Sequence, residues 1–105
     1  MTDVVIQETA TSPVNRVDVA VLDDDRDFLQ FMEDVLNDEG IYAVRCFTTP
    51  GEMYAAFEEK VADILLLDMK MGEHQGSVVL DEVQARWPNV CLVVVTGYPT
   101  LEDMR

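Results

Sequence analysis

The feature that most limits the fold is a run of four apolar residues, 64–67, that ends directly on Asp68. An apolar run without alternating polar positions is typical of a strand buried on both faces, as in parallel sheets. Asp68 would then lie at the carboxyl end of its strand, where open α/β sheets place their ligand crevice. A carboxylate at such a place serves as a nucleophile, a metal ligand or a helix cap.

Segments with the pattern of strands alternate along the chain with segments of helical periodicity. Further strands are expected at residues 17–22, 41–47 and 90–95. The helices between them are expected to begin after the N-cap residues Asp25, Thr49 and Ser77. Gly40 would end the first helix. Strands that alternate with helices predict right-handed βαβ units and one parallel sheet, so the expected fold class is α/β.

Two groups of side chains are expected in the core. Phe28, Phe31 and Met32 recur at helical spacing in the first helix and would face the sheet. Cys46 and Cys91 both fall in apolar segments and lack metal-ligand spacing, so they are expected to be buried thiols. Free thiols are typical of a reducing compartment, which predicts a cytoplasmic location.

Length and composition set broad limits on the class of protein. The chain has 105 residues, of which 49% are hydrophobic, so a disordered chain is excluded and one domain is expected. Residues 1–15 are interpreted as a loosely held tail and residues 16–105 as the domain. No apolar run approaches the length of a membrane span. The formal net charge of −14 argues against nucleic acid or an anionic membrane as partner, and favours cations and basic protein surfaces.

Polar side chains follow three of the expected strands at their carboxyl ends. They are Asp23 and Asp24, then Asp68, then Thr96. If the first and third strands are neighbours, the three carboxylates converge and repel one another unless a cation is bound. A hard divalent ion such as Mg²⁺ or Mn²⁺ binds a few protein oxygens and several waters, which this set offers. With a hydroxyl donor beside it, Asp68 is the best placed nucleophile for a transferred phosphoryl group.

Three alternative roles for the polar residues are weaker. Residues 23–25 alone would be a solvated turn and a helix cap, but the polar residues at two more strand ends disfavour this. The acidic spacing from Asp23 also fits an EF-hand calcium loop, but Phe28 stands where that loop needs glycine, and a strand precedes it. His74 has no serine or cysteine placed to form a catalytic triad with it.

Three motifs resemble the receiver domain of two-component response regulators. They are Leu22-Asp23-Asp24-Asp25, the Leu-Leu-Leu-Asp68 strand followed by Met69-Lys70-Met71 and Gly76, and Val-Val-Val-Thr96-Gly97. The resemblance covers about residues 16–105. It implies a flavodoxin-like (CheY-like) open parallel sheet of strand order 2-1-3-4-5, with helices on both faces.

The resemblance also implies a function. Asp68 would accept phosphate from the phosphohistidine of a histidine kinase or phosphotransfer protein, without a separate catalytic domain. Asp24 and Asp68 would bind Mg²⁺ or Mn²⁺ together with the main-chain carbonyl of Lys70, and Asp23 would contribute through water. The hydroxyl of Thr96 would bind a phosphoryl oxygen.

Departures from the family pattern keep two further functions open. Gly72 stands where the family has proline, which predicts a looser loop. The family's fifth strand, its Lys-Pro pair and its fifth helix do not follow, so the chain is interpreted as a receiver truncated after the fourth strand, either naturally or as a fragment. Without that lysine, a degenerate receiver that only binds other proteins is the alternative. A phosphatase with an aspartyl nucleophile is weaker still, because Lys70 stands where its second carboxylate would be.

The same truncation predicts an interface. Residues 90–95 would become an uncharged, β-branched sheet edge, which natural proteins avoid leaving open. We therefore expect a homo-oligomer in which another copy docks against this edge, with the run at residues 4–6 as a candidate for exchange, or else a neighbouring segment that covers it.

Overall fold

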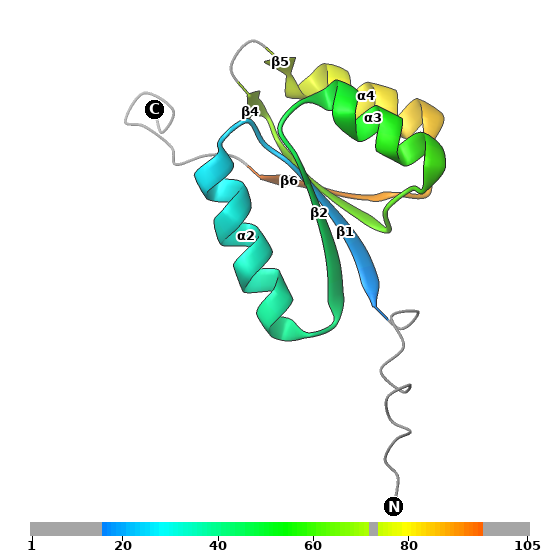
Figure 1. Cartoon of the computed structure of the whole chain (residues 1–105). Helices are drawn as coiled ribbons and strands as arrows, with labels where there is room; N and C mark the ends of the chain where they lie inside the picture. The colour runs from blue at the N-terminus through cyan, green and yellow to red at the C-terminus, as the bar shows by residue number, and fades with distance from the viewer. Residues whose placement is uncertain (1–15, 72–73, 96–105) are drawn as a thin grey trace, which may run out of the picture.

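A computed structural model describes residues 16–71 and 74–95, and its centre is a parallel sheet of four strands. The strands are β1 (Val17–Leu22), β2 (Tyr42–Phe47), β3 (Ile64–Asp68) and β6 (Cys91–Val95). Their order across the sheet is β2-β1-β3-β6 (Figure 1). This is the order expected for the first four strands of the family fold, so the predicted α/β sheet is confirmed.

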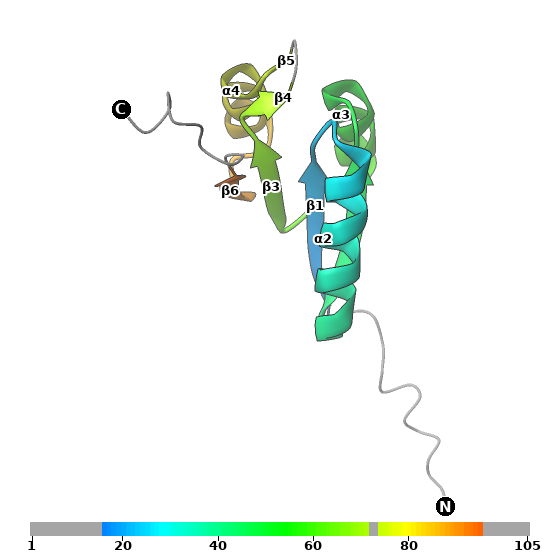
Figure 2. The same ribbon diagram turned by 90° about the vertical axis from the view of Figure 1, so that its left-hand side faces the viewer.

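Three helices cover the sheet on its two faces, as expected. They are α2 (Arg26–Glu39), α3 (Pro50–Glu59) and α4 (Gly76–Arg86). Figures 1 and 2 show α2 on one side of the sheet and the other two helices on the opposite side. None of the helices in the described part of the chain is long and apolar enough to cross a membrane.

Local residue choices fix where the helices begin and end. The side chain of Asp25 accepts hydrogen bonds from two backbone N–H groups of the first turn of α2, and the hydroxyl of Thr49 accepts one at the start of α3. Gly40 ends α2 at a φ of 77°, a left-handed conformation that favours glycine. The expected cap at Ser77 is wrong, because α4 begins one residue earlier, at Gly76.

The larger part of the core lies between the sheet and the pair α3 and α4. Its buried side chains include Ala20, Leu22, Met53, Phe57, Leu65, Leu67, Val79 and Val83. The α2 side has a smaller core of Val19, Val21 and Leu29. Phe31 was expected in this core, but 59% of its surface is exposed. It lies two residues, about 200° of helical turn, from the buried Leu29, and so points away from the sheet.

Among the described residues, the strand β6 forms one edge of the sheet. It pairs in parallel with β3, and no second strand among residues 16–71 and 74–95 pairs with it. The expectation that both cysteines are buried is wrong for Cys91, which is exposed on this strand, while Cys46 is half-buried. The side chains of Val93 and Val94 are also 41% and 45% exposed. Cys91 lies at the far edge of the sheet from the strands against which α2 mainly packs, β2 and β1.

At the amino end of the strands, the buried carboxylate of Asp18 lies beside two cationic side chains. A side-chain oxygen of Asp18 lies 3.2 Å from Nε of Arg45, and its other oxygen lies 3.5 Å from Nζ of Lys60. The N–H of Asp18 donates to the side chain of Asp63 at 2.9 Å. The guanidinium of Arg45 also donates to the main-chain oxygen of Lys60 at 3.0 Å. These contacts tie β1, β2 and the segment before β3 together.

Candidate functional site

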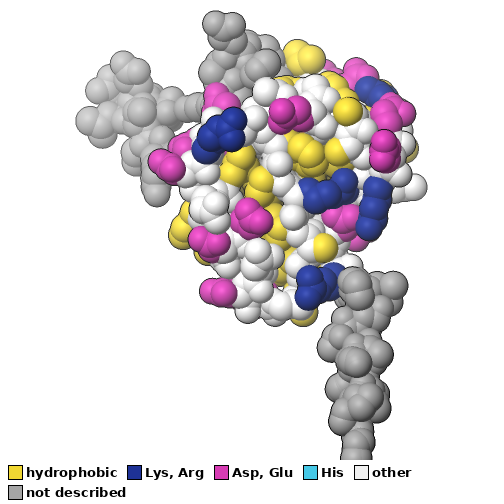
Figure 3. Space-filling model, in the orientation of Figure 1, with side chains coloured by type: hydrophobic (Ala, Val, Ile, Leu, Met, Phe, Trp, Pro, Cys, Tyr) yellow, Lys and Arg dark blue, Asp and Glu magenta, His cyan; other side chains and the backbone are white. Residues whose placement is uncertain are grey.

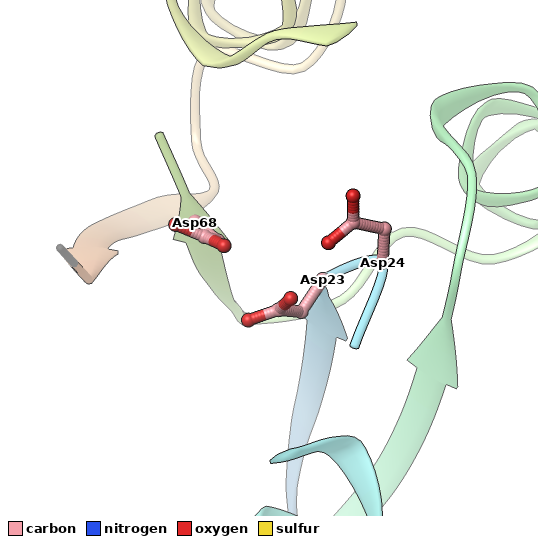
Figure 4. Close-up of side chains that lie close together, drawn as sticks. All are labelled: Asp23, Asp24 and Asp68. Carbon is pink, nitrogen blue, oxygen red and sulfur yellow. The ribbon is translucent and has the colours of Figure 1, made fainter. Parts of the chain in front are cut away.

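The carboxyl ends of two adjacent strands bring three carboxylates together. Asp23 directly follows β1, and its N–H donates to the carbonyl of Phe47 at 3.1 Å, which extends the β1–β2 ladder. Asp68 is the last residue of β3, the strand next to β1. Asp23, Asp24 and Asp68 each offer a ligand oxygen, and these oxygens all lie within 4.8 Å of one another. Figure 4 shows the three side chains around one space, so the predicted convergence is confirmed.

The environment of Asp23 makes its ionised form unfavourable. The residue is 6% exposed. Burial, followed by the nearby carboxylates of Asp68 and Asp24, raises the pKa of Asp23 to about 6 from an ordinary value of 3.8. A hydrogen bond from the N–H of Asp25 to Oδ1 of Asp23, at 2.9 Å, opposes part of this rise in pKa. A cation in the shared space would remove the penalty.

Asp25 differs from its two acidic neighbours in sequence. Its Oδ1 accepts the N–H groups of Asp27 at 3.0 Å and Phe28 at 3.3 Å. This makes Asp25 the N-cap of α2, as predicted, and directs its side chain to the helix. The run of three aspartates is therefore divided between a cap and a candidate site.

The donor set fits a hard divalent cation. Three carboxylates from two strand ends supply oxygen ligands only, which is the chemistry that Mg²⁺ and Mn²⁺ prefer. No Lys or Arg among the described residues forms an ion pair with Asp23 or Asp24. Mg²⁺ usually keeps several waters and takes only a few protein oxygens, so three carboxylates suffice for a site.

A short hairpin follows Asp68 where the sequence indicated only a loop. The two-residue strands β4 (Lys70–Met71) and β5 (His74–Gln75) pair in an antiparallel ladder. The signal in the sequence was a glycine between two short segments, which is typical of a tight connection. The hairpin contains Lys70, whose main-chain carbonyl is the further predicted metal ligand, and that role stays a prediction.

Several predicted residues lie outside the described part of the chain. They are Thr96, Gly72 and the run at residues 4–6. The strand that precedes Thr96 is placed as expected, with Val95 of β6 opposite Asp68 of β3. The predicted role of the Thr96 hydroxyl stays a prediction.

Comparison with known protein families decides what kind of domain this is. A family model described as the response regulator receiver domain matches residues 19–105. The chain belongs to this family. The strand order and the three convergent aspartates agree with that assignment.

Individual relatives of this receiver domain are transcriptional regulators of greater length. The transcriptional regulatory protein ZraR of Salmonella typhimurium is 29% identical over 87 residues, which are 83% of this chain and 20% of the relative. The alginate biosynthesis transcriptional regulatory protein AlgB of Pseudomonas aeruginosa is 27% identical over 95 residues, 90% of this chain and 20% of its own. The receiver domain thus spans about a fifth of the length of the curated relatives it matches.

Solved structures show the same fold. A receiver domain protein (CheY-like) from Methanospirillum hungatei matches with a TM-score of 0.73 and 29% identity, covering 85% of this chain and 70% of the other. NtrX from Brucella abortus matches with a TM-score of 0.72 and 25% identity, covering 83% of this chain and 19% of the other. The CheY-like fold expected from the sequence is therefore confirmed.

Proposed function

We propose that this receiver domain accepts a phosphoryl group on Asp68 from the phosphohistidine of a histidine kinase or phosphotransfer protein. The single observation that supports this is the set of three carboxylate oxygens within 4.8 Å of one another at two adjacent strand ends, in a chain of this family. Asp23, Asp24, Asp68 and the main-chain carbonyl of Lys70 would hold Mg²⁺ or Mn²⁺. The bound cation would neutralise the clustered negative charge.

The chemistry at Asp68 is a substitution at phosphorus. A carboxylate oxygen of Asp68 forms the new P–O bond, and the P–N bond to the donor imidazole breaks, so that histidine leaves with the electron pair. Asp68 is half-buried at a strand end, where a donor can approach it. Asp23 is buried beside it and would act as a fixed oxygen ligand. The reaction ends with a covalent aspartyl phosphate, so the domain acts as an acceptor in a phosphorelay.

The charge of the domain suggests the character of its partner. The chain carries 21 acidic and 7 basic residues, a formal net charge of −14. Figure 3 shows acidic side chains spread over this view of the molecule, with Lys and Arg in fewer places. A partner with a basic surface around its phosphohistidine would be steered toward the site, whereas nucleic acid or an anionic membrane would be repelled. We also propose a cytoplasmic location, because the two cysteines are free thiols, which are typical of a reducing compartment.

The β6 edge is a proposed contact between two copies of the domain. The exposed side chains of Cys91, Val93 and Val94 lie on a strand with one described neighbour. Sedimentation across a dilution series tests this, with Val93→Lys expected to shift the population toward monomer. A monomer at all concentrations, unchanged by Val93→Lys, would contradict the contact.

Intact mass measurement after incubation with Mg²⁺ and acetyl phosphate tests the proposed acceptor function. We expect one added phosphoryl group per chain in the wild type. Asp25→Asn should keep the adduct, because Asp25 caps α2. No adduct in the folded wild type would favour the alternative of a module that only binds other proteins. Steady release of phosphate without an adduct would favour a phosphatase.

A further inference from the structure

The start of α4 touches the backbone that directly follows Asp68. A Cβ atom added at Gly76 would lie 2.5 Å from Cα, 2.8 Å from Sδ and 3.0 Å from the carbonyl oxygen of Met69. The other two described glycines, Gly40 and Gly51, would meet nothing within 4 Å. Gly76 is thus the described position where a missing side chain lets two backbones approach closely.

Neither partner of this contact is free to move away. The N–H of Met69 donates to the carbonyl of Val95 at 3.4 Å, which continues the β3–β6 ladder. On the other side, Val79 and Val83 of α4 are 2% and 0% exposed and pack in the main core. A shift of the helix start away from Met69 would therefore disturb either the sheet or the core.

The contact also closes the hairpin that contains Lys70. The ladder pairs Lys70 with Gln75 and Met71 with His74, so residues 69 and 76 are the two ends of one short loop. Gly76 holds these ends together at the point where the chain leaves Asp68. The position of the Lys70 main chain relative to Asp68 therefore depends on how closely Gly76 approaches Met69.

We propose that Gly76 is a positioning residue for the phospho-acceptor site: its missing side chain sets the place of the Lys70 carbonyl beside Asp68. This inference rests on the proposed function, in which that carbonyl binds the cation. A methyl group at residue 76 would need to move from 2.5 Å to about 3.4 Å from Cα of Met69 to reach ordinary contact, a shift of about 0.9 Å. Mg²⁺ and similar ions demand close to ideal ligand geometry, so a shift of this size weakens binding.

Binding of Mn²⁺ to Gly76→Ala, measured by calorimetry, tests the proposal. Gly51→Ala is the matched control, because Gly51 is also helical but has open space around its Cα. Gly40→Ala is a second control, far from the site in sequence, that strains a left-handed turn (φ 77°). It should lower stability without changing Mn²⁺ affinity. We expect Gly76→Ala to lose about tenfold or more in Mn²⁺ affinity at a temperature where circular dichroism shows it folded. Both controls should stay within about twofold of wild type.

The outcomes separate this inference from the proposed function. A wild type that binds no Mn²⁺ contradicts the proposed metal site itself. A wild type that binds Mn²⁺ and a folded Gly76→Ala that binds it equally well overturn only the role of Gly76. A loss of affinity in Gly40→Ala equal to that in Gly76→Ala would also overturn it, because stability alone would then explain the effect.

If Gly76→Ala does not fold, amide hydrogen exchange of the wild type provides the test. The β4–β5 ladder and the bound cation would both stabilise the same position of the Lys70 main chain, so each must favour the other. Saturating Mn²⁺ should slow exchange of the ladder amides by about tenfold. Unchanged exchange with Mn²⁺ bound would overturn the proposal.

Discussion

Two buried aspartates at the two ends of β1 have opposite surroundings. Asp18, near the start of β1, is 8% exposed, and Asp23, just after its end, is 6% exposed. Asp18 faces two cationic side chains, at 3.2 and 3.5 Å. Asp23 faces two other carboxylates, and burial together with these neighbours raises its pKa to about 6. The amino end of the sheet is thus a neutralised cluster, and the carboxyl end gathers like charges.

The difference favours the amino end as a stabilising cluster and the carboxyl end as the proposed functional site. A buried carboxylate paired with Arg45 and Lys60 needs nothing further. A buried carboxylate beside two others lowers stability until a cation or a proton arrives. Proteins tolerate such local destabilisation where activity requires it. The contrast along β1 therefore supports the placement of the acceptor site at the carboxyl end.

The largest expected effect is the loss of phosphoryl transfer, which should follow a substitution at the carboxyl end of the sheet and not one at the amino end. Asp68→Asn should abolish the phosphoryl adduct, because the amide has no nucleophilic carboxylate. Asp63→Asn, which changes an aspartate at the amino end, should retain it. Intact mass after acetyl phosphate and Mg²⁺ measures both. An adduct that persists in Asp68→Asn would place the acceptor elsewhere.

Removal of the Arg45 side-chain charge at the amino end should have the next largest effect, a loss of stability. Arg45→Met leaves the buried Asp18 with Lys60 as its remaining ion-pair partner, whose side chain is 76% exposed. We expect the free energy of unfolding to fall by about 2 kcal/mol, since breaking a buried pair is costly and this one is partly exposed. Lys60→Met, as control, should cost less than about 1 kcal/mol. Urea denaturation measures both, and equal losses would contradict the assigned order.

Removal of the buried carboxylate at the carboxyl end should have the opposite sign. Because the folded-state pKa of Asp23 is raised from 3.8 to about 6, protonation stabilises the fold below about pH 4, and this stability is lost as pH rises through about 6. Asp23→Asn should remove that loss and raise metal-free stability at pH 7 by about 1–2 kcal/mol. Urea denaturation from pH 4 to 7 measures the difference between the two proteins. A difference that does not change with pH would contradict the raised pKa.

Asp24→Asn should give the smallest effect on stability, because Asp24 is exposed. Relief of repulsion should raise metal-free stability by up to about 1 kcal/mol. The same substitution should weaken Mn²⁺ binding, because one charged ligand is lost. Calorimetric titration measures this, and equal affinity in wild type and Asp24→Asn would remove Asp24 from the site.

The sequence allowed prediction of the features that depend on chain direction and periodicity. Parallel strands end at one edge, so Asp23 and Asp68 had to meet once β1 and β3 were neighbours. The ion pair between Asp18 and Arg45 was not predictable. The two residues are 27 residues apart in the sequence, and their contact depends on the β1–β2 register. The exposure of Phe31 was missed because the sheet-facing side of α2 includes Leu29, which lies about 200° of helical turn from Phe31. The exposure of Cys91 was missed because it depends on tertiary packing. Whether an apolar side chain is buried depends on which part of the sheet the neighbouring helix covers.

The contact between Gly76 and Met69 was also beyond prediction. Gly76 belongs to one of the sequence motifs, but only the packing of α4 on the main core shows that a side chain there would meet backbone atoms. Close approach of two backbones depends on tertiary structure, and helical or strand periodicity carries no signal for it.

Thermal unfolding at pH 7, with and without Mn²⁺, tests most directly whether the carboxyl end of the sheet is a cation site. If the three carboxylates bind the ion, a concentration of about 100 times Kd should stabilise the wild type by about 2.7 kcal/mol and raise Tm by about 10 °C or more. The rise should be much smaller in Asp68→Asn and unchanged in Asp63→Asn. Equal Tm values for the wild type with and without Mn²⁺, up to millimolar concentration, would contradict the site.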